Sequence, residues 1–246
     1  MEKLTDKQKL EEELRRVNQK LLSAEKVQSD FLSNIKNEIN NPLTSIMGLL
    51  KVVNDNPRDH QGNIEINKLV YKEVYNLNFQ MRNILTAAEI EAGQTSPNIS
   101  KFNVSELINE VCQAFVSIDS SKEDVLTVVA SGELDFTTDK EKLSIIVTNL
   151  VSNALKFNKP NEKVMITAEQ ESENKLILSI RDFGVGIDED SLKTIFDRFK
   201  QLDSGTRKEF GGHGLGLSVV HALVSMLNGD FSVHSIRFLY CYLPHR

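Results

Sequence analysis

The chain contains 246 residues, enough for one or two domains, because domains usually run to about 100–200 residues. The hydrophobic fraction is 40% and the charged fraction 26%, which excludes a collagen-like or wholly disordered chain. The net charge of −6 excludes a domain-wide basic field, so we expect no nucleic acid partner. Two cysteines, Cys112 and Cys241, are too few for a disulfide scaffold or a cysteine-built zinc site.

The sequence predicts a cytoplasmic chain. No stretch reaches the length of about 20 apolar residues that spans a bilayer, so we expect no membrane segment. The N-terminus (MEKLTDKQKLEEELRR) also lacks the apolar segment of a secretory signal, and both cysteines are expected to be reduced. The alternative is that the chain is the soluble part of a longer membrane receptor.

Residues 1–30 are predicted to form a coiled-coil helix. They contain seven acidic and seven basic residues and neither glycine nor proline. Apolar side chains recur in alternating steps of four and three, which defines a heptad. This seam consists of Leu10, Leu14, Val17, Leu21 and Ala24. The alternative is a single solvated helix.

The heptad is interrupted shortly afterwards. From Ile35 the apolar steps become four and four, through Ile39 and Leu43, which unwinds a supercoil locally. Pro42 lies at this point, and it lacks the N–H that would bond the carbonyl group of Glu38, so we expect a kink. A kink at a change of register indicates a functional site.

A helical hairpin is predicted next. Residues 54–62 (NDNPRDHQG) form a turn cluster, and a second amphipathic pattern runs from Ile66 to Ala88 and ends near Gly93. A lone hairpin of this length leaves one apolar stripe exposed to water. Two copies would bury their stripes as a four-helix bundle, so we expect a homodimer.

Residues 93–98 (GQTSPN) have the composition of a linker, and the pattern beyond them mixes helices and strands. Helices are expected at Val104–Ser117, Lys140–Phe157 and Gly214–Leu227, and strands at Val125–Ala130, Val164–Glu169, Lys175–Arg181, Asp230–Val233 and Phe238–Leu243. This order predicts an α+β sandwich with one layer of strands and one of helices.

Three polar residues project from the otherwise apolar helix at 140–157. Asn149, Asn153 and Lys156 are spaced by four and three, so they share one helical face. Two amides and an ammonium group on one face could bind a cation and phosphate oxygens. The alternative is an exposed polar stripe.

A second polar segment begins with Asp182, directly after an expected strand, and continues with Gly184 and Gly186. The carboxylate could accept an N–H from a ring system that the two glycines allow to approach the backbone. The alternative is a simple β-turn.

Two further segments follow. Phe196–Phe199 begins a stretch that contains glycine and ends at Phe210, which indicates a mobile lid. The run Gly211–Gly216 then opens a helix, where backbone N–H groups make an anion site for phosphates. One glycine-rich loop is a weak signal, but four such segments in this order are a strong one.

The order NLVSNALKF, RDFGVGI, IFDRF and GGHGLGLSVV resembles the N, first glycine, F and second glycine boxes of the sensor histidine kinase catalytic domain. The segment FLSNIKNEINNPLTSIMG resembles the H box of the family's helical dimerisation domain. The resemblance covers the chain from about Asp30 and implies a phosphoacceptor-type dimerisation hairpin at 31–94 and a catalytic ATP-binding domain at 95–246, after the coiled-coil signalling helix that the heptad predicts at 1–30. The implied fold class is α+β: a dimeric four-helix bundle followed by an α/β sandwich of the histidine kinase and gyrase type.

The resemblance also implies a site for ATP and Mg²⁺. Asn153 would ligate Mg²⁺ between the ATP phosphates, and Asn149 and Lys156 would support the metal and the phosphates. Asp182 would accept the adenine amino group, with room for the ring provided by the glycines of its segment. The glycines expected to cradle the phosphates beneath the lid are Gly212, Gly214 and Gly216.

The sequence departs from the family at the phosphoacceptor, where Asn37 replaces the histidine. An imidazole nitrogen has an available lone pair, and the neighbouring Glu38 could take its proton. The lone pair of an amide nitrogen is delocalised into the carbonyl group, so Asn37 cannot serve as the acceptor. Lys36 is a poor substitute, because one residue turns the helix by about 100°.

Asn41 lies four residues after the acceptor position, where the family uses Thr or Asn to orient the water that removes phosphate from a response regulator. The alternative is that Asn41 merely precedes Pro42. A second departure is the lack of the family's glycine turn between the last two strands, at 233–238, which leaves the shape of that hairpin open.

The sequence thus predicts a histidine-kinase-like signalling protein that binds ATP and Mg²⁺ but cannot phosphorylate itself in cis at position 37. It would act on a response regulator receiver domain as a phosphatase or scaffold, or in a mixed dimer, under an upstream sensor domain. One alternative is an active kinase whose histidine was changed deliberately. Another is a non-catalytic interaction module with a vestigial nucleotide site.

Overall fold

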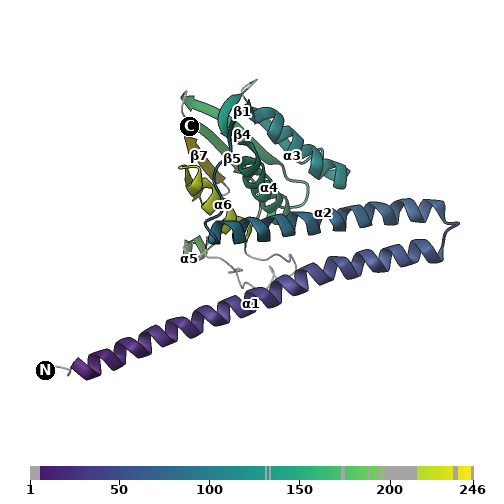
Figure 1. The fold of residues 1–246 in the computed structure, drawn as a ribbon. Helices are drawn as coiled ribbons and strands as arrows, with labels where there is room; N and C mark the ends of the chain where they lie inside the picture. The colour runs from purple at the N-terminus through teal and green to yellow at the C-terminus, as the bar shows by residue number, and fades with distance from the viewer. Residues whose placement is uncertain are drawn as a thin grey trace.

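The computed structural model describes residues 6–130, 132, 134–172, 175–187, 189–192, 195–196, 215–234 and 238–244. Helices α1 (Asp6–Asp55) and α2 (His60–Glu91) form an antiparallel hairpin, and the remaining elements form a second body that packs on α2 (Figure 1). None of the helices in the described part of the chain is long and apolar enough to cross a membrane.

A proline lies within α1, and α2 has an N-terminal cap and a glycine just after its end. α1 continues through Pro42, which is buried, and the hydroxyl of Thr44 donates to the carbonyl oxygen of Asn40 at 2.8 Å. Asp59 is the N-cap of α2, and its carboxylate accepts from the N–H of Gly62 in the first turn. α2 ends before Gly93, whose φ of +63° suits a residue without a side chain.

The apolar stripes of the hairpin are exposed in the single chain. The four seam residues Leu10, Leu14, Val17 and Leu21 are all more than half exposed, and Met47 on the same helix is 72% exposed. Figure 1 shows the N-terminal part of α1 extending beyond α2 and the second body. Apolar area of this extent is typical of a surface that a partner covers.

The second body contains two sheets. Its strands are β1 (Ile99–Asn103), β2 (Leu126–Ala130), β3 (Asp135–Asp139), β4 (Val164–Ser172), β5 (Lys175–Arg181), β6 (Asp230–His234) and β7 (Phe238–Pro244). The larger sheet has the order β2-β4-β5-β7-β6, in which only the β2–β4 pair is parallel. β6 and β7 pair without the glycine turn of the family, and residues 235–237 between them lie outside the described part.

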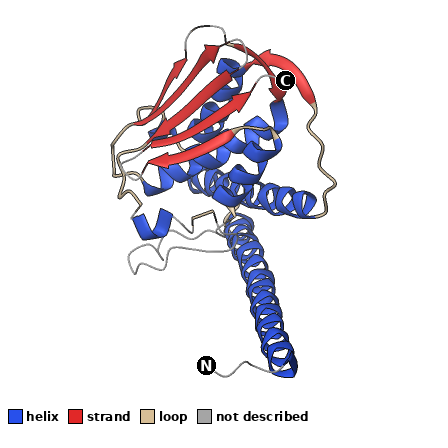
Figure 2. Cartoon of the chain, turned by 90° about the vertical axis from the view of Figure 1, so that its left-hand side faces the viewer, coloured by secondary structure: helices blue, strands red, loops and turns tan. Residues whose placement is uncertain are grey.

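Helices cover one face of the larger sheet, as Figure 2 shows. They are α3 (Val104–Ile118), α4 (Lys140–Phe157) and α6 (Gly216–Met226). The second body also contains the short helix α5 (Glu189–Leu192) and the 3-10 turn η1 (Ser120–Lys122). Between the layers, Leu150 of α4, Ile166 of β4 and Leu223 of α6 are fully buried. The predicted two-layer α+β sandwich behind a helical hairpin is therefore confirmed.

The sequence analysis missed the smaller sheet. β1 and β3 pair antiparallel, with Phe102 opposite Phe136. Neither segment alternates clearly between apolar and polar residues, because their ends also cap helices: the Asn103 side chain caps α3 and the Asp139 side chain caps α4. The linker at 93–98 consequently leads straight into a strand.

Candidate nucleotide-binding site

The structure brings three of the four predicted segments to one end of the second body. Asn149 and Asn153 project from α4, and α6 begins beside them at Gly216. A Cβ atom at Gly216 would lie 2.8 Å from Asn149 Oδ1 and 3.8 Å from Asn153 Nδ2. The N box and the start of the glycine-box helix are therefore in contact, as the resemblance implies.

The turn after β5 packs against the end of α4. A Cβ atom at Gly184 would overlap the carbonyl oxygen of Phe157 and would lie 2.8 Å from its carbonyl carbon. The N–H of Gly184 donates to Asp182 Oδ1 at 2.8 Å, and Gly186 has a φ of +69°. The close approach of Phe157 at Gly184 and the positive φ at Gly186 both favour glycine. The sequence had suggested a different reason, room for a ring system.

Asn158 is a positioning residue that the sequence analysis missed. Its Oδ1 accepts from the N–H of Phe183 at 2.9 Å, and its Nδ2 donates to the carbonyl oxygen of Glu162 at 2.7 Å. Asn158 therefore joins the end of α4 to the peptide that follows Asp182. The available signal was an Asn directly after a helix, a residue type that commonly bonds nearby backbone groups.

Asn149 and Lys156 differ in their surroundings. Asn149 is only 2% exposed and its amide bonds Asn83 of α2, so it faces the hairpin. Lys156 is half-buried, and its ammonium group lies 5.0 Å from the centroid of the Phe157 ring. Of the three polar residues on this face of α4, Asn153 and Lys156 have the more accessible side chains.

The described part of the predicted lid is anchored by an aromatic contact. The Phe196 ring lies 5.3 Å from the His221 ring on α6 and 5.4 Å from the Phe231 ring on β6. Ile195 beside it is buried. The rest of the lid and the glycines Gly212 and Gly214 lie outside the described residues.

The predicted acceptor region lies on α1. Lys36, Asn37 and Asn41 are exposed there, and the side chain of Glu38 lies outside what the structure describes. Asn37 and Asn41 are one helical turn apart and so share a face. The main contacts between the hairpin and the second body come from α2 instead.

Burial controls the chemistry of both cysteines. Desolvation raises the pKa of Cys112 to about 11 and raises the pKa of Cys241 further still. Neither thiol is therefore a useful nucleophile at neutral pH, because the thiolate is the reactive form. The described residues also contain no group of three His, Cys, Asp or Glu side chains able to hold a metal ion.

Residues 138–240 match the family model described as histidine kinase-, DNA gyrase B- and HSP90-like ATPase. The chain is 32% identical over 214 residues to the autoinducer 2 sensor kinase/phosphatase LuxQ of Vibrio parahaemolyticus, a match that covers 84% of this chain and 25% of LuxQ. It is also 32% identical over 233 residues to the sensor protein GacS of Pseudomonas syringae, covering 91% of this chain and 25% of GacS. The chain thus spans about a quarter of the length of these curated relatives.

Solved structures share the fold. The Acinetobacter baumannii histidine kinase AdeS superposes with a TM-score of 0.58 at 22% identity, over 85% of this chain and 98% of that one. The histidine kinase ThkA, solved in complex with the response regulator TrrA, superposes with a TM-score of 0.56 at 22% identity, over 100% of this chain and 68% of that one. The family match and the curated relatives identify the chain as histidine-kinase-like, with an ATP-binding ATPase domain at 138–240, and the solved structures share its fold.

Proposed function

We propose that this chain binds ATP with Mg²⁺ between α4, the end of β5 and the start of α6, and that it cannot phosphorylate itself at position 37. One observation carries the proposal: the segments with Asn153, Asp182 and Gly216 converge in space, whereas an amide occupies the acceptor position. The first half of this pattern supports nucleotide binding, and the second half argues against autophosphorylation.

The residues present suit a magnesium nucleotide. Mg²⁺ usually takes one or two protein ligands and completes its shell with water and substrate phosphates, so Asn153 can serve without a carboxylate cluster. Lys156 would contact the phosphates, as would the backbone of Gly212, Gly214 and Gly216. The first turn of α6 presents its N–H groups there, and its N-cap, Leu215, makes no side-chain cap hydrogen bond among the described residues. The metal would neutralise charge on the phosphate oxygens.

Asp182 would recognise the adenine base of ATP. Its Oδ1 accepts from the N–H of Gly184, which fixes the orientation of the carboxylate, and Asn158 restrains the next peptide. A carboxylate only accepts hydrogen bonds, so it distinguishes an adenine amino group from the carbonyl group of guanine. We therefore infer a preference for ATP over GTP.

The acceptor region supports a role in phosphate removal or scaffolding. Asn41 is exposed one turn from Asn37, where its amide can orient a water molecule on the surface of a docked receiver domain. Glu38 would assist from the same region. A mixed dimer could alternatively transfer phosphate to the histidine of a partner chain.

The proposed assembly is a homodimer through the hairpin, because the exposed stripes of α1 and α2 would be buried in a four-helix bundle. A sensor domain is proposed upstream, since the relatives are about four times as long as the matched region. ThkA was solved with a response regulator, and a receiver domain of that class is the partner proposed here.

Calorimetry with a non-hydrolysable ATP analogue tests the nucleotide site. We expect Mg-dependent binding that Asp182→Asn or Asn153→Ala abolishes. Asp124→Asn, a change of the same kind at an exposed aspartate, should leave the affinity unchanged. Absence of binding in the parent protein would refute the proposal.

Radiolabelled ATP tests position 37. The parent protein should remain unlabelled, whereas Asn37→His should become labelled, because imidazole restores a nucleophile. Strong labelling of the parent would show that another residue accepts phosphate. A phosphorylated receiver domain should lose phosphate faster with the parent than with Asn41→Ala, and equal rates would leave only the scaffold role.

A further inference from the structure

A buried pair of amides joins the hairpin to the nucleotide-binding domain. Asn83 Nδ2 on α2 donates to Asn149 Oδ1 on α4 at 3.0 Å, and Asn149 Nδ2 donates back to Asn83 Oδ1 at 2.8 Å. Asn83 is 7% exposed and Asn149 is 2% exposed. Hydrogen bonds between buried amides matter most when one partner is lost, because the other is then left desolvated and unsatisfied.

The side-chain amide of Asn149 uses both of its N–H donors and its oxygen in hydrogen bonds within the protein. One N–H of Nδ2 bonds Asn83 and the other bonds the carbonyl oxygen of Ile145 at 2.9 Å, so both donors are used. Oδ1 accepts from Asn83, and Gly216 closes over it from α6. Asn149 therefore cannot turn toward a metal or phosphate while α2 keeps its hydrogen bonds.

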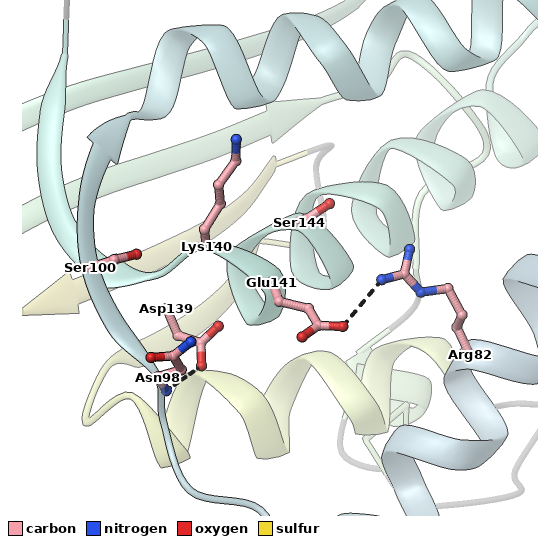
Figure 3. Close-up of a pocket in the computed structure, with 7 residues that line it drawn as sticks. All are labelled: Arg82, Asn98, Ser100, Asp139, Lys140, Glu141 and Ser144. Atoms are coloured by element: carbon pink, nitrogen blue, oxygen red, sulfur yellow. Dashed lines mark hydrogen bonds and ion pairs between the residues drawn. The ribbon is translucent and has the colours of Figure 1, made fainter.

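Two pockets lie at the margins of this joint between α2 and the ATPase domain. A pocket of about 370 Å³ is lined from both sides of the joint, and Figure 3 shows Arg82 of α2 reaching across it toward Glu141 of α4. Their ion pair is 3.4 Å long with side chains 50% and 75% exposed, so it adds little stability. A second pocket of about 210 Å³ lies between α2, α3 and α4, lined among others by Tyr75 and Thr148.

The centre of the joint is small. Besides Asn83, the buried residues of α2 are Thr86 and Ala87, both short side chains. Ile84 and Ile90 of α2 also pack, partly buried, against the core of the ATPase domain, so the joint combines apolar contact with the amide pair. The amide pair is the most specific contact in it.

We propose that Asn83 holds Asn149 away from the nucleotide, so that docking of α2 on the ATPase domain competes with binding of the magnesium nucleotide. This inference rests on the proposed function of the site. Because coupling between two binding events is reciprocal, the nucleotide must then favour opening of the joint to the same extent that opening favours the nucleotide.

A cysteine at Thr86 provides a direct measure of joint opening. Thr86 is buried and close to cysteine in size, so Thr86→Cys should react with a maleimide only when the joint opens. The native thiols of Cys112 and Cys241 are buried with raised pKa values and give little background. In the Thr86→Cys background, we expect Asn83→Ala to increase the labelling rate without nucleotide. Asn76→Ala, at an exposed asparagine of the same helix, should not change it.

The affinity for a magnesium-bound, non-hydrolysable ATP analogue gives the second readout. Asn83→Ala should bind it roughly five- to tenfold more tightly than the parent, and the analogue should speed labelling of Thr86→Cys. Asn83→Asp can accept from Asn149 but cannot donate to it, so it should act in the same direction if Asn83→Ala fails to fold.

The outcomes separate this inference from the proposed function. Binding that is unchanged or weaker in Asn83→Ala would overturn the inference alone, because the amide pair would then be neutral or would support the site. Unchanged labelling in Asn83→Ala would likewise overturn it. Absence of binding in the parent would overturn the proposed function, and the inference with it, because no nucleotide would then compete with α2.

Discussion

Gly184 lies where the turn after β5 approaches the last carbonyl groups of α4. Any side chain there would push this turn away from Phe157, and the carboxylate of Asp182 would move with it. Asn158 holds the same turn from the other side through the N–H of Phe183. The position of one carboxylate therefore depends on a glycine and an amide that need not touch the nucleotide.

We expect Gly184→Ala to abolish nucleotide binding and to lower the free energy of unfolding by about 1–3 kcal/mol, because the added methyl group must displace backbone. Calorimetry and denaturant titration measure the two effects. Gly48→Ala is the matched control, since a Cβ atom there meets nothing within 4 Å and alanine favours a helix. Normal binding by Gly184→Ala would contradict the geometry described for the turn.

α4 depends on the cap at its first turn. Asp139 Oδ1 accepts from the N–H of Lys142, and Oδ2 accepts from the Lys142 ammonium group and from the N–H of Asn98. Burial opposes the charged form of Asp139, but these hydrogen bonds outweigh it, so the pKa of this carboxyl lies below its usual value. One side chain thus starts the helix that carries the N box and ties it to the segment before β1.

The pH dependence of stability follows from the sign of this shift. A carboxyl with a lowered pKa in the folded state contributes stability that is present above its unfolded pKa, about 4, and is lost as the pH falls through the folded value. Asp139→Asn should lower the free energy of unfolding at pH 7 by about 1–3 kcal/mol and should make it less sensitive to acid below pH 4.

Denaturant unfolding between pH 7 and pH 2.5 measures this difference. Asp135→Asn is the control, because Asp135 forms an exposed ion pair with Lys101 and should change stability by less than about 1 kcal/mol. If the free energy of unfolding changed with pH in the same way in the parent and in Asp139→Asn, the charge of Asp139 would not contribute to stability.

The two parts of the molecule differ in how well they bury their apolar side chains. The ATPase domain closes its own core between the sheet and helices α3, α4 and α6, whereas the hairpin leaves large apolar side chains exposed on both helices. The most exposed of these in the bundle region include Met47, Tyr71 and Leu85. A second copy of the hairpin would bury them, and the domain joint at Asn83 would then lie beside the dimer interface.

We expect the protein to sediment as a dimer and the double variant Met47→Glu, Leu85→Glu to dissociate, with a dissociation constant raised roughly 30-fold or more. Two carboxylates in an apolar seam would each be desolvated without a partner. Lys51→Glu, at an exposed position of α1, serves as the control and should remain dimeric. A monomeric parent at micromolar concentration would refute the proposed bundle.

Much of this fold follows from local pattern. The apolar spacing of α4 predicted its bounds, Lys140–Phe157, and alternation predicted β5 at Lys175–Arg181, because periods of 3.6 and 2 are properties of neighbouring residues. β1 and β3 could not be predicted in this way. Their residues serve at once as strand ends and helix caps, and their pairing joins segments that are far apart in the sequence.

The sequence alone predicted the order of the nucleotide-site segments and the replacement of the acceptor histidine by Asn37, because each is read from residue types at short spacings. Only the tertiary structure decided which groups those residues meet. Asn149 and Asn83 are 66 residues apart, and nothing in the local pattern of either helix shows that their amides bond each other. The partner of a buried polar group depends on how whole elements pack, and here that packing places a residue of the hairpin against the nucleotide site.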